Sequence, residues 1–107
     1  MHERRKFERV NLPASAKVFA TLADNQVLGP VTVLGRGGFM VDTKRVLALN
    51  QPVAIVIVEE KDGIRRVVRA LPRYHSPEGV GFEFDGLEAD AAVEIGVIIG
   101  RHYVSGA

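Results

Sequence analysis

Arginine side chains near the start of the sequence are the groups in this chain best suited to chemistry. Arg4, Arg5, Lys6 and Arg9 place four cations within six residues. A guanidinium carries a planar fork of donors that can bind a phosphate through two hydrogen bonds or lie flat on a purine, whereas an ammonium is a point charge. The segment has no apolar stripe that would make it an ordinary amphipathic helix. Two interpretations remain open: an anion-binding segment, or a solvated basic tail.

A glycine-rich turn around Arg36 is a second feature that could hold an anion. Gly35, Gly37 and Gly38 surround this arginine, and backbone N–H groups in such a turn can bind a phosphate. The turn lacks the lysine and the serine or threonine of a Walker motif, and a predicted strand rather than a helix follows it. A dinucleotide-binding fold is therefore not supported.

The rest of the sequence offers little catalytic or metal-binding chemistry. The chain has no cysteine, which excludes disulfides, thiolate nucleophiles and cysteine-bound zinc, and fits a reducing cytoplasm. His2, His75 and His102 lack the paired spacing of a helical metal site. No serine lies in a nucleophile-elbow pattern. We therefore expect no catalytic residues, no metal and no cofactor, and a protein that is not an enzyme.

A second group of arginines occupies a predicted strand and the loop after it. Arg65 and Arg69 share one face of an alternating strand and Arg66 points the other way, with Arg73 following. Solvated strand faces account for most such arginines, and the net charge of the whole chain is only +1. Nucleic-acid binding stays a minority alternative, which would show affinity falling steeply with salt.

The length and composition of the chain predict one domain. Its 107 residues, 47% of them hydrophobic, suffice for a single core. The start of the chain has charges where a signal peptide needs an apolar segment, and no apolar run approaches the length of a membrane span. We expect a cytoplasmic protein without membrane insertion. The sequence does not distinguish a natural protein from an excised domain.

Apolar alternation dominates up to about residue 84 and predicts an all-β domain. Asp24-Asn25, Lys61-Asp62-Gly63 and similar turn sequences separate the strands. The predicted strands cover residues 16–22, 27–33, 39–43, 53–58, 64–71 and 79–84. Six short strands suit a small closed antiparallel barrel, which leaves no exposed edges.

A C-terminal helix at about residues 86–104 follows the strands. Asp85 and Glu88 are spaced like a helix-capping pair. One side carries apolar residues at helical intervals, namely Ala91, Ala92, Ile95, Ile98 and Ile99, with His102. The other side carries Val93, Val97 and Val104, and Gly96 and Gly100 would let a second backbone come close. The helix is either a deeply seated terminal element or a surface for self-association as a homodimer.

Taken in order, these features resemble a PilZ domain over nearly the whole chain. Arg5 and Arg9 are similar to the two arginines of the family's RxxxR motif, with Arg4 adjoining it, and residues 79–84 are similar to its closing barrel strand. The resemblance implies a six-stranded antiparallel barrel of the split-barrel type with a C-terminal helix. It also implies that residues 1–10 are a flexible leader that folds over the second messenger cyclic di-GMP, while residues 11–107 form the barrel domain.

The family's second motif, (D/N)xSxxG, is matched only in its glycine. When Gly38 takes that position, Val33 stands where the family has Asp or Asn, and Gly35 where it has Ser. Those polar side chains hydrogen-bond a guanine in the family, and neither residue here can replace them. The backbone of residues 35–38 and the side chain of Arg36 could compensate, so the resemblance implies a ligand site made of Arg4, Arg5, Arg9, Gly35, Arg36 and Gly38.

Three functions from different classes follow from these observations. The first is a single-domain receptor that binds cyclic di-GMP, with reduced affinity, and relays the signal by contact with another protein. The second is a degenerate PilZ adaptor that has lost the nucleotide and acts only as an interaction module. The third, less favoured, is a small nucleic-acid-binding barrel. For a PilZ domain the protein partner is expected in motility, pilus, exopolysaccharide or virulence machinery.

Overall fold

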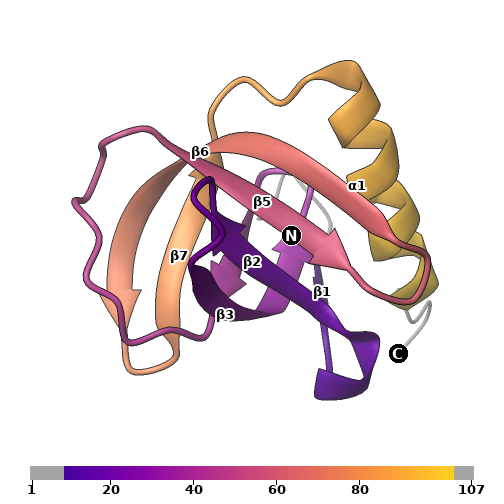
Figure 1. Cartoon of the computed structure of the whole chain (residues 1–107), viewed down its shortest axis with the longest axis horizontal. Helices are drawn as coiled ribbons and strands as arrows, with labels where there is room; N and C mark the ends of the chain where they lie inside the picture. The colour runs from indigo at the N-terminus through magenta and orange to yellow at the C-terminus, as the bar shows by residue number, and fades with distance from the viewer. Residues whose placement is uncertain (1–8, 103–107) are drawn as a thin grey trace, which may run out of the picture.

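Alternating apolar and polar side chains build the strands of a small barrel, with one helix lying against its side (Figure 1). The computed structural model describes residues 9–102. In that range the strands are β1 (Arg9–Asn11), β2 (Val18–Leu22), β3 (Val27–Gly35), β4 (Gly38–Val41), β5 (Val53–Glu59), β6 (Ile64–Ser76) and β7 (Gly79–Phe84). A short 3-10 helix (Ala14–Ala16) precedes β2, and helix α1 (Ala89–His102) follows β7.

The sheet closes on itself because β3 pairs with β4 as well as with β2. The strand order is β1-β3-β2-β5-β6-β7-β4, and the additional β3–β4 pairing joins the ends, so β2 to β7 form a six-stranded ring. Every pairing is antiparallel. The fold class predicted from the sequence, a six-stranded antiparallel barrel with one C-terminal helix, is confirmed, and β1 is an additional strand.

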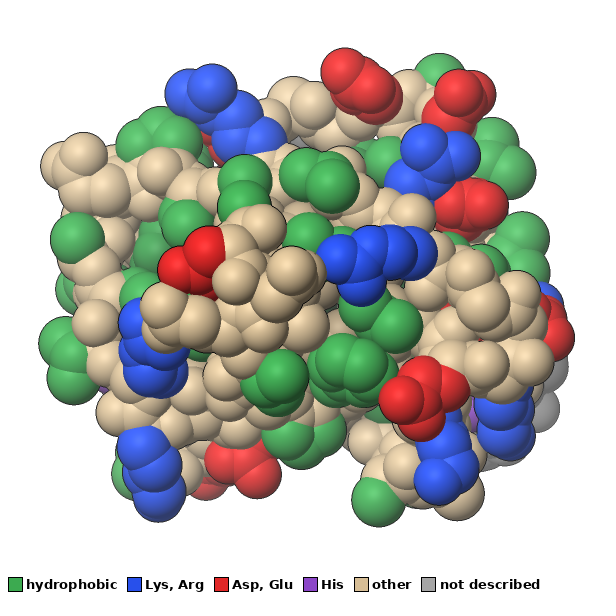
Figure 2. Space-filling view, viewed as in Figure 1, with side chains coloured by type: hydrophobic (Ala, Val, Ile, Leu, Met, Phe, Trp, Pro, Cys, Tyr) green, Lys and Arg blue, Asp and Glu red, His purple; other side chains and the backbone are tan. Residues whose placement is uncertain are grey.

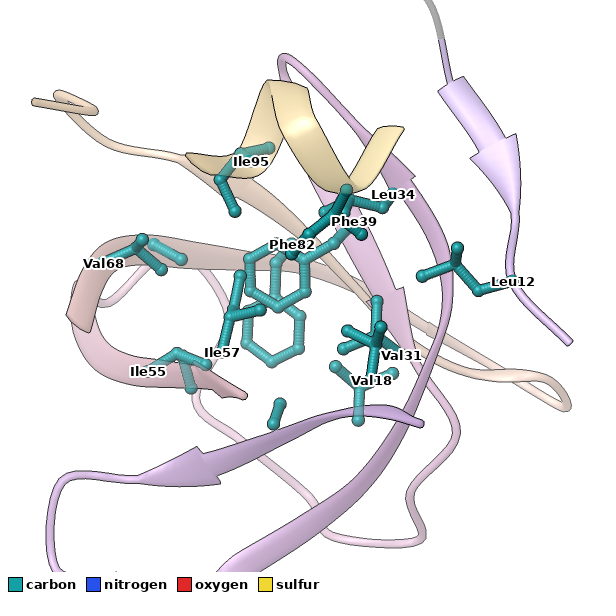
Figure 3. Packing of buried hydrophobic residues seen from close by; sticks show 14 of the residues in the cluster. Leu12, Val18, Val31, Leu34, Phe39, Ile55, Ile57, Val68, Phe82 and Ile95 are labelled. Carbon is teal, nitrogen blue, oxygen red and sulfur yellow. The ribbon is translucent and has the colours of Figure 1, made fainter. Parts of the chain in front are cut away.

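The barrel core is filled by inward-facing aliphatic and aromatic side chains from every strand (Figure 3). The rings of Phe39 and Phe82 stack with centroids 4.8 Å apart, and Phe84 lies 5.3 Å from Phe39. Ile95 points from the helix toward this aromatic pair (Figure 3). The helix is therefore part of the same core, because its buried side chains, Ala91, Ile95, Ile98 and Ile99, belong to the same hydrophobic cluster.

The helix begins three residues later than predicted, at Ala89 instead of 86. The carbonyl oxygen of Glu88 accepts the first helical hydrogen bond, from the backbone N–H of Ala92 at 2.8 Å. The carboxylate of Asp85 does not cap the helix, because it accepts a hydrogen bond from Arg69 at 2.7 Å. Residues 103 and 104, which the prediction included in the helix, lie outside the described residues.

Ion pairs hold the outer side of the helix to the β5–β6 hairpin. Arg101 in the last turn contacts Glu59 and Asp62, and Glu94 in the middle accepts a hydrogen bond from Arg66. Glu59 is fully buried. The hydrogen bond to Glu59 raises the pKa of Arg101, and the bond to Glu94 raises the pKa of Arg66. Both guanidinium groups therefore stay protonated until strongly alkaline pH, and both arginines carry their positive charge at neutral pH.

The strand ends differ from the sequence prediction by one to five residues in five of the six predicted strands, and one further strand was not predicted. β1 was not predicted, because a strand of three residues is too short to show alternation. β6 continues to Ser76, although Pro72 lacks the N–H that a ladder needs. The register shift between Pro72 and Tyr74 accommodates the proline, so the strand carries on past it.

Candidate ligand-binding site

Pairing of β1 with β3 brings the two sequence motifs together. Arg9 lies directly opposite Gly35 in the antiparallel register. Partners in such a pair have Cα atoms about 4.5–5.5 Å apart, so the last residue of the arginine motif adjoins the first residue of the glycine turn. Arg36 and Gly38 follow Gly35 at the tip of the β3–β4 hairpin. The other two predicted site residues, Arg4 and Arg5, lie outside the described residues.

The outer face of β1, β3, β4, β7 and β6 carries the candidate site in two adjacent rows. Side chains alternate along a strand, and Leu34, Phe39 and Phe82 point into the core, so their neighbours face outward. In strand order, the first row is Arg9, Gly35, Gly38 and Glu83. The second row is Asn11, Val33, Met40, Gly81 and Tyr74. The first row contains the charged groups, and the second is largely apolar.

Gly38 is a glycine because β4 and β7 approach closely at this point. It lies opposite Glu83, and a Cβ placed on it would collide with the carbonyl oxygen of Phe82. No other residue fits without moving one strand. The motif glycine therefore has a structural role here, and it leaves the surface beside Arg36 without a side chain.

Val33 occupies the place that the family resemblance gives to Asp or Asn. It pairs with Asn11 on one side and with Met40 on the other, and its side chain is half-buried. An isopropyl group neither donates nor accepts hydrogen bonds. The structure thus places an apolar side chain between Asn11 and Met40 on this face.

The side chain of Arg36 rests on helix α1. Its Nη1 and Nη2 atoms lie 3.5 and 3.6 Å from the point where a Cβ of Gly96 would stand. Gly96 therefore makes room for the guanidinium, and any side chain larger than alanine would press against it. This contact connects the candidate site to the helix, a link that the sequence did not predict.

Acidic partners neutralise the second arginine group. Arg66 binds Glu94, Arg69 binds Asp85 and Arg73 binds Glu83, whereas Arg65 donates to the side chain of Asn25. On the face shown in Figure 2, cationic and anionic side chains are interspersed. Within residues 9–102, Arg9 and Arg36 have no such acidic partner. A continuous basic stripe that could track a nucleic acid is absent from this described part of the chain.

A separate cavity of about 460 Å³ lies between the β5–β6 strands and the segment that leads into the helix. Pro52, Val67 and Leu87 line it, together with the Arg69–Asp85 pair. The described members of the predicted site, Arg9, Gly35, Arg36 and Gly38, do not line this cavity. Residues 9–102 contain no group of His, Asp and Glu side chains that could hold a metal ion, and no helix long and apolar enough to cross a membrane.

Comparison with known proteins shows the family to which the chain belongs. The sequence model of the family described as "PilZ domain" matches residues 3–100. The chain belongs to the PilZ domain family. Among solved structures, it is similar to the PilZ domain of YcgR from Escherichia coli, solved with c-di-GMP, at 20% sequence identity and a TM-score of 0.72. The match covers 94% of this chain and 92% of the other. A search of curated proteins found no match.

In this PilZ barrel, sequence reasoning missed the second row of the outer face. Asn11, Met40 and Tyr74 were not predicted as site residues, since each looked like an ordinary strand position. A signal was present in the alternating glycines of β7, Gly79 and Gly81. Glycines spaced by two remove side chains from one face of a strand, so neighbouring strands determine what covers that face.

Proposed function

We propose that this PilZ domain is a receptor that binds cyclic di-GMP on the outer face of β1, β3 and β4. The observation that supports it most is the register of Arg9 opposite Gly35, which joins the two motif segments into one surface. Arg9 would bind a phosphate bidentately, with Arg4 and Arg5 of the leader covering the ligand from above. Arg36 and the backbone of the turn would contact the same nucleotide.

The affinity should be lower than that of a receptor with both motifs intact. Val33 and Gly35 replace two side chains that hydrogen-bond a guanine in the family. A hydrogen bond contributes about 0.5–1.5 kcal/mol, so two losses correspond to roughly five- to hundredfold weaker binding.

The signal would reach a partner through helix α1. Arg36 touches Gly96 of the helix, so a phosphate bound by the guanidinium would be coupled to the helix through that contact. Next to Gly96, Val93 and Val97 are 66% and 43% exposed. We propose that they form part of the surface offered to a protein of motility, pilus, exopolysaccharide or virulence machinery in the cytoplasm.

Isothermal titration with cyclic di-GMP tests the receptor function. The unaltered chain should give saturable heat, Arg9→Ala should lose it, and Arg65→Ala, an exposed strand arginine away from the site, should keep it. Val33→Asp should tighten binding by restoring the polar group. Equal heats from Arg9→Ala and the unaltered chain would reject the site.

The second candidate is an adaptor that does not bind the nucleotide. The apolar Val33 at the base-recognition position and the exposed valines of α1 favour it. In that case the helix would dock on a partner protein or on a second copy of the chain. If the unaltered chain gives no saturable heat in the titration and Val33→Asp binds the nucleotide, the adaptor function is supported.

A further inference from the structure

A row of side chains on the outer face lies beside the proposed phosphate contact. Val33 is opposite Met40, Met40 is opposite Gly81, and Gly81 is opposite Tyr74. Because Gly81 has no side chain, the ring of Tyr74 lies over it; a Cβ there would collide with ring atoms Cε1 and Cζ. Tyr74 is 49% exposed, so the rest of its ring is open to solvent.

We propose that Val33, Met40 and Tyr74 form a base platform that binds one purine of a cyclic purine dinucleotide by stacking and apolar contact. The proposal rests on the proposed function, since Arg9 supplies the phosphate contact that holds the ligand to this face. The platform would replace the hydrogen bonds that Val33 and Gly35 cannot make.

The spacing of the barrel suits a single nucleotide. Val33 and Gly35 lie two residues apart on the same face of β3, so a phosphate held by Arg9 opposite Gly35 is about 7 Å along the strand from the platform. Met40 lies one strand further, about 4.8 Å across. The ring of Tyr74 lies over Gly81 of β7, so it forms the end of the same row on the side of Met40 away from Val33.

Stacking predicts weak selection between purines. Every base has a π-face, so recognition by aromatic and apolar side chains tolerates changes in the base. A site built on hydrogen bonds to a base rejects a ligand that lacks them by up to about 10⁴-fold. The platform side chains offer only the Tyr74 hydroxyl as a polar group, so we expect cyclic di-AMP to bind within about tenfold of cyclic di-GMP.

Titration calorimetry of Tyr74 variants with both dinucleotides tests the platform. Tyr74→Ala should weaken both ligands by about 5- to 150-fold, the loss typical of one stacked base, while Tyr74→Phe should bind like the unaltered chain. Val67→Ala is the matched control, because Val67 is an apolar residue on the same strand and is 65% exposed. Thermal melting of each variant checks that the barrel is folded.

A spectroscopic measurement keeps the test independent of the stability of Tyr74→Ala. The chain has two tyrosines and no tryptophan, so Tyr103→Phe leaves Tyr74 as its single fluorophore of this kind. Saturation with cyclic di-GMP should then quench or shift the tyrosine emission. Unchanged emission at saturation would overturn the platform.

The outcomes separate the platform from the proposed function. If Tyr74→Ala binds as tightly as the unaltered chain, the platform is wrong and nucleotide binding stands. If the unaltered chain gives no saturable heat with either dinucleotide, the proposed function and the platform both fail. A preference for cyclic di-GMP above about a thousandfold would require specific hydrogen bonds and would overturn recognition by stacking.

Discussion

At the scale of single residues, Gly38 shows how a binding motif can also be a packing requirement. The family resemblance assigned it to the ligand, and the structure gives it a reason that holds without any ligand, the close approach of β4 to Phe82 of β7. The resemblance alone could not separate these roles, because both predict the same glycine.

Gly38→Ala should therefore destabilise the protein whether or not nucleotide is present. The added methyl group meets backbone rather than a movable side chain, so we expect a loss of about 3 kcal/mol or more and a Tm lower by about 10 °C or more. Gly100→Ala is the control, since among the described residues its Cβ position has no contact within 4 Å beyond its own helix backbone and chain neighbours. Thermal denaturation followed by circular dichroism measures both, and an unchanged Tm in Gly38→Ala would contradict this account.

The second residue-scale prediction concerns the buried carboxylate of Glu59. Its Oε1 accepts from Arg101 at 2.5 Å, and its Oε2 has no partner within the described residues 9–102. A buried acceptor that loses its donor costs about 1–3 kcal/mol. Arg101→Leu should therefore lower the Tm, and adding Glu59→Leu should recover part of the loss because the uncompensated charge is removed. If Glu59→Leu lowers the Tm further in that background, Arg101 does not compensate a buried charge.

At the scale of elements, the sequence predicted the six longer strands and missed the three-residue strand β1. The six barrel strands and the helix could be found from periodicity and turn residues. β1 has only three residues, and its place beside β3 depends on pairing that no local pattern records. Arg9, Gly35 and Arg36 could be named from the sequence because they lie in or beside its motifs. Met40 and Tyr74 could not, because only strand pairing brings them to the same face.

The contact between Arg36 and α1 gives the element-scale prediction. Gly96→Leu should displace the guanidinium from its place on the helix, and because Arg36 is then less well positioned, we expect binding of cyclic di-GMP to weaken several-fold. Gly100→Leu adds the same side chain to the same helix in open space and should leave the affinity unchanged. Both changes raise helix propensity equally, so the difference isolates the Arg36 contact. Equal affinities of the two variants in titration calorimetry would rule out a positioning role for Gly96.

At the scale of the whole molecule, ion pairs occupy most of the strand arginines outside the candidate face. Arg66, Arg69 and Arg73 are matched by carboxylates, so the net charge of +1 conceals several local ion pairs. Arg9 lies opposite Gly35 of the glycine turn, and Arg36 contacts the helix that would carry the signal outward. The barrel thus combines one candidate ligand surface with one candidate output element, and the side chain of Arg36 contacts both.

The location of the site is the central claim, and a titration of the ¹⁵N-labelled chain with cyclic di-GMP, followed by amide chemical shifts, tests it most directly. We expect saturable shifts at residues 9–11, 33–40 and 81–83 and at Tyr74, with smaller shifts around Gly96 of α1. Amides around the cavity lined by Pro52, Val67 and Leu87 should not move. Shifts centred on that cavity, or no shifts at any ligand concentration, would contradict it.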